Sequence, residues 1–415
     1  HIQDRWQLLK MRVFTLILLV LIFSCKSEEK KLNDSSKATL SNFQMQVDSL
    51  FNSVIKKDEP GAAILISYND SVLFSKGYGL RDLSTNMPIT TSTNMRIGSV
   101  SKQFTALGIL SLVENEQLNL NDSIYKFYPY ESLKGVTIKQ MLSHTSGIVD
   151  ADTEYWKRWT LDRPATNNDI IDWYKKHDRK VFNPGEKFEY NNSAYQLLAS
   201  LIEKISGKEF SEYIKENVLE KADMETSLFY NLSKPTQISE RAYCYEKDST
   251  GTWQKVDGHY LNGIVGAGCL YTNLNDFVKY SSTLRQRKIL MTEIDSLLFQ
   301  PVVEVKELAD RDFYIIRESG SFYGMGWEVN ETMAVHGGET FGAHSFVIYE
   351  FNRPLTIAIF MNSNSLFETE PNLLDETYKL TDKYLKTTAN NAYSKAVRWL
   401  RELQFLQLIV NWSFG

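Results

Sequence analysis

The stretch RIGSVSK (96–102) leads directly into a long apolar run, QFTALGILSLVENEQ (103–117). Read as a helix, it places Ser99 and Lys102 three residues apart on one face, so that their side chains can meet. A serine hydroxyl becomes a good nucleophile when a neighbouring base removes its proton, and a desolvated lysine amine can be that base. A helix N-terminus beneath the serine adds backbone N–H groups that suit a developing oxyanion. The stretch therefore indicates an acyl-transfer enzyme.

The four-residue pattern itself is common. Ser-x-x-Lys begins at four positions in this chain, namely Ser27, Ser53, Ser99 and Ser123. The copy at Ser99 differs from the others because a glycine precedes it and an apolar periodic run follows it. The structural alternative is a helix cap followed by a surface lysine, and the tetrapeptide alone does not exclude it.

Composition limits the class of protein. The chain has 415 residues, of which 43% are hydrophobic and 23% charged, as expected for a large globular protein of one or two domains. A net charge of -5 and the absence of a basic, aromatic-rich cluster argue against nucleic acid as a partner. No Cys/His spacing typical of zinc sites is present in the sequence, and we expect neither a metal nor another cofactor.

The N-terminal region predicts export. Met11 and Arg12 precede an apolar run, VFTLILLVLIF (13–23), which is too short to span a bilayer but has the length of a signal-peptide core. Ser24 and Cys25 follow, and a small residue before a cysteine at this point resembles a bacterial lipoprotein processing site. That resemblance implies cleavage before Cys25 and its acylation, which would anchor the protein to a membrane on the periplasmic or cell-surface side. The alternative is an ordinary secretory signal with an incidental cysteine.

These features divide the chain. Residues 1–10 lie before the plausible start and are interpreted as an artefact, 11–24 as the signal peptide and 25–39 as a polar linker. If Cys25 is acylated, Cys244 and Cys269 remain, and export would allow them to form a disulfide. Two buried thiols are the simpler interpretation.

Strand patterns occur at both ends of the remaining sequence. A helix is expected over 40–56, followed by a hairpin of GAAILISY (61–68) and VLFSKGYG (72–79). The region from about 130 to 320 is mostly helices and loops. Strand signals return at MGWEV (325–329), MAVHGG (333–338) and the hairpin SFVIYEF (345–351) to LTIAIFMN (355–362), and a helix is expected over 371–386. We therefore predict an α+β fold: an antiparallel sheet assembled from both ends, flanked by helices, with a helical domain inserted between them.

A second constellation follows the turn Asn183-Pro184-Gly185-Glu186. Tyr190 lies just before a predicted helix, and Asn192 lies near its start. Because a nearby ammonium group lowers the pKa of a tyrosine, Tyr190 could share the base role with Lys102. Tyr-x-Asn also occurs at Tyr260 and Tyr271, and the alternative is a core tyrosine beside a helix cap.

A third candidate is His336-Gly337-Gly338, the only His-x-Gly of the sequence, at the end of a predicted strand. The two glycines would let a substrate lie along the strand edge. The N–H of Glu339 could then serve as a second oxyanion donor. A lone histidine at a strand end is otherwise usually structural.

Taken together, GSVSK, EYNNSAY and HGGE resemble the serine β-lactamase and penicillin-binding-protein superfamily. The branch that the chain resembles more closely is the class C β-lactamase-like one, which also contains DD-peptidases and esterases and has Tyr-x-Asn as its middle motif. Further similar segments are TIKQMLSHTSGI (137–148), NPGEKFEYNNSAYQLLASLIEKISG (183–207), GAGCLYTNLNDFVKY (266–280) and YGMGW (323–327). The resemblance covers roughly residues 40–385, and we expect one hydrolase domain over 40–386 with a helical subdomain at about 130–320.

The resemblance implies an acyl-enzyme reaction on an amide, ester or lactam carbonyl of a small molecule or cell-wall peptide. It makes Ser99 the nucleophile, with Lys102 and Tyr190 moving its proton and Asn192 binding both Lys102 and the substrate amide. The backbone N–H groups of Ser99 and Glu339 would form the oxyanion hole beside Gly337 and Gly338. It also implies that His336 supports Tyr190 and a substrate carboxylate, and that His144 has a structural role in holding the helical domain.

The third motif departs from the family's β-lactamases, which usually begin it with lysine. A fixed cation pairs with the carboxylate of a β-lactam, whereas a histidine of ordinary pKa is only partly charged. The sequence therefore favours a DD-peptidase-like or esterase-like hydrolase over an efficient β-lactamase. The alternatives are a slowly acylated or non-catalytic lipoprotein that binds penicillin or peptidoglycan, and a scaffold with an inactive site. The tail over 387–415 is of unknown role, and the sequence does not predict the oligomeric state.

Overall fold

A computed structural model describes residues 37–305, 321–369 and 372–390 of the chain. The predicted signal peptide, Cys25 and most of the tail over 387–415 lie outside the described residues. Over the parts that are described, none of the helices combines the length and the apolar character needed to cross a membrane. In the same residues no cluster of three or more potential metal ligands occurs.

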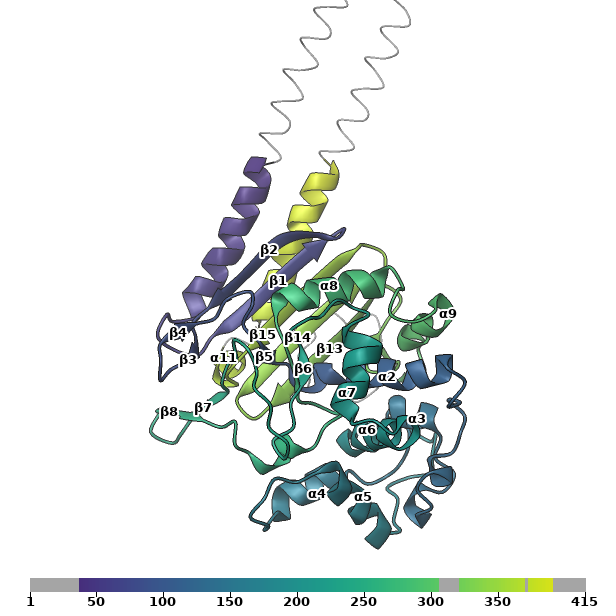
Figure 1. The fold of residues 1–415 in the computed structure, drawn as a ribbon. Coiled ribbons are helices and arrows are strands. Elements are labelled where there is room, and N and C mark those ends of the chain that lie inside the picture. The colour runs from purple at the N-terminus through teal and green to yellow at the C-terminus, as the bar shows by residue number, and fades with distance from the viewer. Residues whose placement is uncertain (1–36, 306–320, 370–371, 391–415) are drawn as a thin grey trace, which may run out of the picture. The chain divides into compact units, whose positions relative to one another are not determined.

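The main sheet of the described chain has eight antiparallel strands in the order β10-β11-β12-β13-β14-β15-β1-β2. Figure 1 labels the part of it from β13 to β2. Strands from the two ends of the domain meet where β1 pairs with β15, with Ala62 opposite Met361 and Tyr68 opposite Leu355. The predicted α+β fold, with a sheet built from both ends of the domain, is therefore confirmed. The strands are β1 (Ala62–Tyr68), β2 (Ser71–Tyr78), β10 (Val303–Glu304), β11 (Phe322–Tyr323), β12 (Glu328–Val329), β13 (Met333–Thr340), β14 (Ala343–Glu350) and β15 (Leu355–Met361).

Both predicted hairpins are present. β1 and β2 are joined through Asn69 and Asp70, which have φ angles of 52° and 59°, the left-handed geometry of a tight hairpin turn. The strand expected over 325–329 is shorter than predicted and covers only Glu328 and Val329. Gly326 has a φ of 78°, so the chain turns just before this strand begins.

Helices and loops fill most of the chain between β2 and β10. Two short sheets lie there, β5-β9-β6 and β7-β8, and a third, β3-β4, follows β2 directly. The helix α8 packs against β1, whereas α2 packs against α6, α7 and α9. The helices are α2 (Lys102–Glu114), α3 (Ile138–Leu142), α4 (Ala151–Arg158), α5 (Asn167–Lys176), α6 (Asn192–Ser206), α7 (Phe210–Ile214), α8 (Leu274–Arg285), α9 (Thr292–Asp295) and α11 (Ser365–Thr369). The short strands are β3 (Leu80–Asp82), β4 (Met87–Pro88), β5 (Met95–Arg96), β6 (Leu228–Phe229), β7 (Tyr245–Lys247), β8 (Trp253–Lys255) and β9 (Leu270–Thr272).

The helix α2 is buried on nearly all sides, since its first eleven residues, from Lys102 to Leu112, are all buried. Such a helix belongs to the interior of a large domain and not to its surface. The helix directly follows the turn Gly98–Ser101, so Ser99, the predicted nucleophile, lies immediately before a buried helix.

The chain divides into two compact units, one of them from Phe51 to Asp375. The other comprises the described residues up to Leu50 and from Glu376 onward. It contains most of the helix over 37–54 and of the helix over 373–390, near the ranges predicted for these two helices. Within it, Phe43 stacks on Tyr384 with ring centroids 4.6 Å apart.

The close approach of β13 to the nucleophile turn leads to a first prediction. A Cβ atom on Gly338 would lie 2.2 Å from the carbonyl oxygen of Ile97, which forces the backbone apart. Gly338→Ala is therefore expected to destabilise the fold by about 1–3 kcal/mol, the usual cost of overpacking, as measured by urea unfolding. Gly258→Ala is the control, because a Cβ there meets no atom within 4 Å. Equal stabilities of the two variants would contradict this account.

Candidate active site

Ser99 lies in a 3-10 turn, Gly98–Ser101, and the α-helix begins only at Lys102. The sequence predicted one continuous helix, and the difference has a local cause. Ile97 N–H donates to the carbonyl of Leu270, so the chain leaves the small sheet here and turns sharply at Gly98, where φ is 49°. Residues i and i+3 eclipse each other in a 3-10 turn, which brings the side chains of Ser99 and Lys102 together more directly than an α-helix would.

The amine of Lys102 is the centre of the site. Its Nζ donates to Ser99 Oγ at 2.9 Å, to Asn192 Oδ1 at 2.8 Å and to the carbonyl oxygen of Ala267 at 3.0 Å. The same atom lies 4.7 Å from the centroid of the Tyr190 ring. Lys102 is fully buried. The structure thus brings together all four residues of the first two predicted motifs.

Asn192 owes its place to the start of α6. Asn191 is the N-cap of that helix, and its side chain accepts the N–H of Ala194. The backbone N–H of Asn191 in turn donates to Nδ1 of His144, at 3.1 Å. The ring of His144 lies against the ring of Tyr190, with centroids 4.3 Å apart. This geometry fits the structural role expected for His144.

His336 lies on β13 and is buried. Its Nδ1 is 2.6 Å from the carbonyl oxygen of Gly337, and its Nε2 is 3.0 Å from the hydroxyl of Tyr323. The ring centroids of His336 and Tyr190 are 6.4 Å apart, so the histidine is also beside the tyrosine that it was expected to support. Burial raises the pKa of Tyr323 well above its ordinary value, so that its hydroxyl keeps its proton.

The backbone around Gly338 approaches the nucleophile turn closely. A Cβ on Gly338 would lie 3.0 Å from the amide nitrogen of Ser99, and one on Gly98 would lie 2.9 Å from the amide nitrogen of Glu339. The hydroxyl of Ser345 on β14 also reaches the turn and donates to Ile97 O at 2.7 Å. The two amides expected to form the oxyanion hole therefore lie at one junction.

The sequence reasoning missed several residues of this neighbourhood. The first is Tyr323, in the YGMGW segment, where no role was assigned. The second is Ala267, whose carbonyl accepts from Lys102. Asp150 and Asp152 were also missed, although an aspartate before a helix and another in its first turn are typical of a capped N-terminus.

The segment that carries the Ala267 carbonyl is held against α2 by three side chains of that region. Thr105 Oγ1 donates to Gly266 O at 2.6 Å, Lys102 donates to Ala267 O, and Ser101 Oγ accepts from Leu270 N–H at 3.1 Å. The end of the turn and the first residues of α2 thus contain polar side chains that hold the segment of Ala267 in place.

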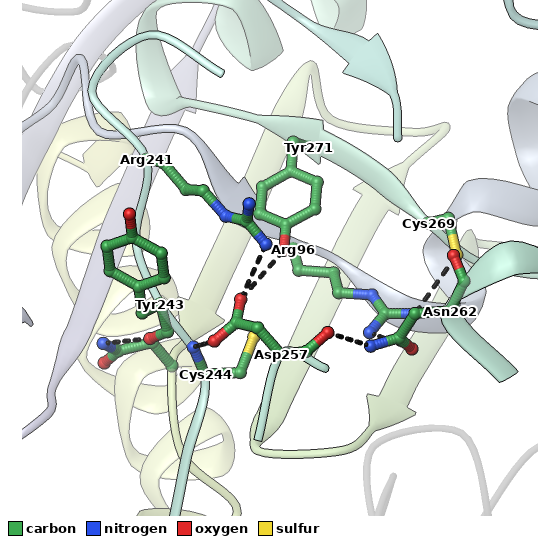
Figure 2. A network of polar contacts seen from close by, with 9 residues as sticks. Arg96, Arg241, Tyr243, Cys244, Asp257, Asn262, Cys269 and Tyr271 are labelled. Carbon is green, nitrogen blue, oxygen red and sulfur yellow. Dashed lines mark hydrogen bonds and ion pairs between the residues drawn. The ribbon is translucent and has the colours of Figure 1, made fainter. Parts of the chain in front are cut away.

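Figure 2 shows a polar network that includes Cys269, which lies two residues after Ala267. Arg96 donates to Asn262 Oδ1 at 2.6 Å and contacts Cys269 Sγ at 3.1 Å. A second guanidinium, that of Arg241, pairs with Asp257 at 2.8 Å. Arg96 is three residues before Ser99, and Cys269 is two residues after Ala267. The network therefore connects the segment that carries Ser99 to the segment that carries the Ala267 carbonyl.

The two described cysteines belong to the same network. Both are buried and free, as the simpler interpretation of the sequence expected. Burial raises the pKa of Cys244 to about 12, so its thiol stays protonated near neutral pH. A protonated, buried thiol behaves as a packing group and not as a nucleophile.

Comparison with known proteins identifies the family of this chain. The family described as Beta-lactamase matches residues 44–377. The chain belongs to that family. The predicted superfamily is thereby confirmed, and with it the class of serine hydrolases of the β-lactamase and transpeptidase fold.

The similarity to individual proteins extends over most of the chain, but the sequence identity is low. Penicillin-binding protein 4* of Bacillus subtilis is 27% identical over 349 residues, which cover 80% of this chain and 75% of that protein. The octameric penicillin-binding protein homologue of Pyrococcus abyssi is 26% identical, with a TM-score of 0.66 over 80% of this chain and 78% of that one. D-amino acid amidase of Ochrobactrum anthropi SV3 shares the fold, with a TM-score of 0.66 and 20% identity over 85% of this chain and 99% of that one.

The Arg96 network leads to a second prediction. A lysine at position 96 lacks the planar fork that reaches Asn262 and Cys269 together, so one buried acceptor would lose its donor. Arg96→Lys is expected to lower the free energy of unfolding by about 1–3 kcal/mol in urea. Arg179→Lys is the control, since Arg179 makes an exposed ion pair with Glu154. An Arg96→Lys protein as stable as the control would show that the network contributes nothing.

The geometry around Lys102 leads to a third prediction. Lys102→Met keeps the apolar stem and removes the amine, so we expect a folded protein whose rate of acylation falls about a thousandfold or more. Fluorescent penicillin labelling and thermal unfolding measure the two effects. The matched control is Lys126→Met, in another Ser-x-x-Lys copy, where the lysine side chain is exposed and pairs with Asp122. Undiminished acylation of Lys102→Met would exclude the amine as the base.

Proposed function

We propose that the protein hydrolyses amide or ester bonds through an acyl-enzyme on Ser99, as a peptidase-like or esterase-like member of the class C β-lactamase-like branch. The observation that carries the proposal is the contact between Lys102 Nζ and Ser99 Oγ, 2.9 Å long, at a fully buried amine. A lysine in such a place is costly to bury, and proton transfer from the serine gives the amine a function there.

The reaction would proceed in two steps. The reaction starts from the neutral amine, whose two N–H groups donate to Asn192 and Ala267 while its lone pair faces Ser99 Oγ. Lys102 then accepts the proton of Ser99 as the oxygen attacks the carbonyl carbon, and Tyr190, against the same amine, shares the proton with it. The negative charge that develops on the carbonyl oxygen is stabilised by the N–H groups of Ser99 and Glu339. The proton then passes to the leaving amine or alkoxide. Water, activated by the same pair, releases the acyl group and restores Ser99.

Asn192 has two roles in this proposal. Its Oδ1 accepts from Lys102 and so holds the amine toward Ser99. Its location at the first residue of α6 would also let the side-chain amide bind the substrate's own amide group, as the family resemblance implies.

His336 favours a peptidase or esterase over an efficient β-lactamase. A carbonyl oxygen only accepts, so Nδ1 carries the hydrogen toward Gly337, and the Tyr323 hydroxyl can donate to Nε2 of a neutral ring. Neutral imidazole satisfies both contacts. A histidine that can be neutral in these contacts is not a fixed cation of the kind that a lysine would offer to a lactam carboxylate.

The substrate class is proposed from the relatives. One is named a penicillin-binding protein and another a D-amino acid amidase. We therefore expect substrates with an amide or ester next to a small D-configured residue, such as a cell-wall peptide. Acylation at Cys25 would place the enzyme at a membrane surface.

The experiment that tests the function is a comparison of Ser99→Ala with the unaltered protein, which is the fourth prediction. Fluorescent penicillin should label the unaltered protein, and p-nitrophenyl esters and D-alanyl peptides should be turned over faster than nitrocefin. Ser99→Ala should lose labelling and lower turnover by about 10³-fold or more. Ser53→Ala, at an exposed serine of another copy, should behave like the unaltered protein.

Either of two results would reject the proposal. Labelling without turnover of any of these substrates would indicate a penicillin-binding protein that is acylated but does not hydrolyse. The same labelling and turnover in Ser99→Ala as in the unaltered protein would show that Ser99 is not the nucleophile.

A further inference from the structure

Two aspartates outside the three sequence motifs lie next to Asn192. Asp150 is the N-cap of α4, and its carboxylate accepts the backbone N–H groups of Asn192, Ser193 and Asp152 at 3.1, 3.2 and 3.3 Å. The hydroxyl of Ser193 also donates to it, at 2.8 Å. One carboxylate thus ties the starts of α4 and α6 together.

Asp152, in the first turn of α4, contacts the side chain of Asn192 itself. Its Oδ2 lies 3.4 Å from Nδ2 of Asn192, and the side-chain amide of Gln196, one turn along α6, also donates to the carboxylate. The backbone N–H of Asp152 donates to Ser193 Oγ at 3.0 Å. The carboxylate is therefore held in a defined position beside the amide.

The amide of Asn192 can satisfy both neighbours in one orientation only. The Lys102 amine donates to it, whereas an ionised carboxylate can only accept. Hence Oδ1 must face Lys102 and Nδ2 must face Asp152, as the 2.8 Å and 3.4 Å contacts have it. Rotation of the amide by half a turn would place two donors together and two acceptors together.

We propose that Asp152 is a positioning residue for the acyl-transfer site: its carboxylate orients the amide of Asn192, which in turn directs Lys102 toward Ser99. This inference rests on the proposed function of Ser99. It adds a carboxylate to the site, so that carboxylate, amide, amine and hydroxyl form one hydrogen-bonded chain through four residues.

The orientation requires an ionised carboxylate. Protonated Asp152 could donate to Oδ1 of a rotated amide, and the part of the preference that Asp152 supplies would be lost. Burial and then the neighbouring charge of Asp150 raise the pKa of Asp152 to about 6, while Gln196, Lys102 and Asn192 oppose the rise. The charge of Asp152 also acts on Tyr174 of α5 and on Tyr260, and burial is the main cause that raises the pKa of each tyrosine. Activity should therefore fall as the pH falls through about 6.

Asp152 also opposes folding at neutral pH. Because its pKa is raised, the folded chain binds the proton more tightly than the unfolded chain does, so the ionised carboxylate costs stability above about pH 6. Replacing it with asparagine should leave the melting temperature at pH 8 unchanged or higher. If the role of Asp152 were merely structural, its replacement would lower the melting temperature.

The fifth prediction concerns Asp152→Asn, measured with a p-nitrophenyl ester between pH 4.5 and 9. We expect kcat to fall about ten- to a hundredfold at pH 8, with KM little changed. Losses of this size are typical when a residue that orients an active-site side chain is removed. The acidic limb of the kcat profile near pH 6 should disappear. Asp152→Glu, which restores a carboxylate, should recover part of kcat and an acidic limb.

Glu154→Gln is the matched control, because it removes the same charge from the same helix at a residue that pairs with Arg179. An Asp152→Asn enzyme with the kcat and pH profile of this control would overturn the positioning role. So would a lower melting temperature with a proportional loss of active protein. In either case Ser99-dependent turnover in the same assays would leave the proposed function intact, whereas turnover that survives Ser99→Ala would overturn both.

Discussion

The structure of the site depends on one buried amine. Lys102 is fully enclosed, and an amine in such a place is stable only if hydrogen-bond acceptors surround it. The acceptors are the serine three residues earlier, the start of α6 and the carbonyl of Ala267, and the last two are far from Lys102 in the sequence. Each segment that supplies an acceptor must therefore be correctly placed relative to α2. The buried amine therefore couples the packing of the helical region to the alignment of the nucleophile.

A second constraint is the close approach of β13 to the turn that carries Ser99. Only glycine fits at positions 98 and 338, because a Cβ at either would collide with backbone of the other segment. The same lack of side chains brings the amides of Ser99 and Glu339 to one junction. Packing of the two segments and the arrangement of the oxyanion donors thus have a single cause, and neither can change without the other.

Much of the fold was predictable because it is encoded by local pattern. Period-two alternation and turn residues located both hairpins, and apolar periodicity located the helix after Ser99. The two short strands around residues 322–329 were harder, since they are two residues each and are separated by a turn at Gly326. The 3-10 geometry at Ser99 was also not predictable, because a bond from Ile97 to Leu270 imposes it and these residues are far apart in sequence.

The sequence by itself determined the residue types of the site and the order of its three motifs, and those were enough to indicate the superfamily. Context favoured the copies at Ser99 and Tyr190, but the Ser-x-x-Lys and Tyr-x-Asn patterns themselves do not distinguish their copies. The tertiary structure does, because Lys126 and Lys56 make exposed ion pairs whereas Lys102 is buried. Asn262 likewise binds Arg96 and Asn273 caps α8, so that among the three Tyr-x-Asn copies Asn192 is the one that meets the amine. The placement of Asp152 beside Asn192 was also decided only by folding, since forty residues separate them and the contact arises where α4 packs against α6. Local pattern specifies what a segment can become, and burial decides which of several equivalent segments acquires a function.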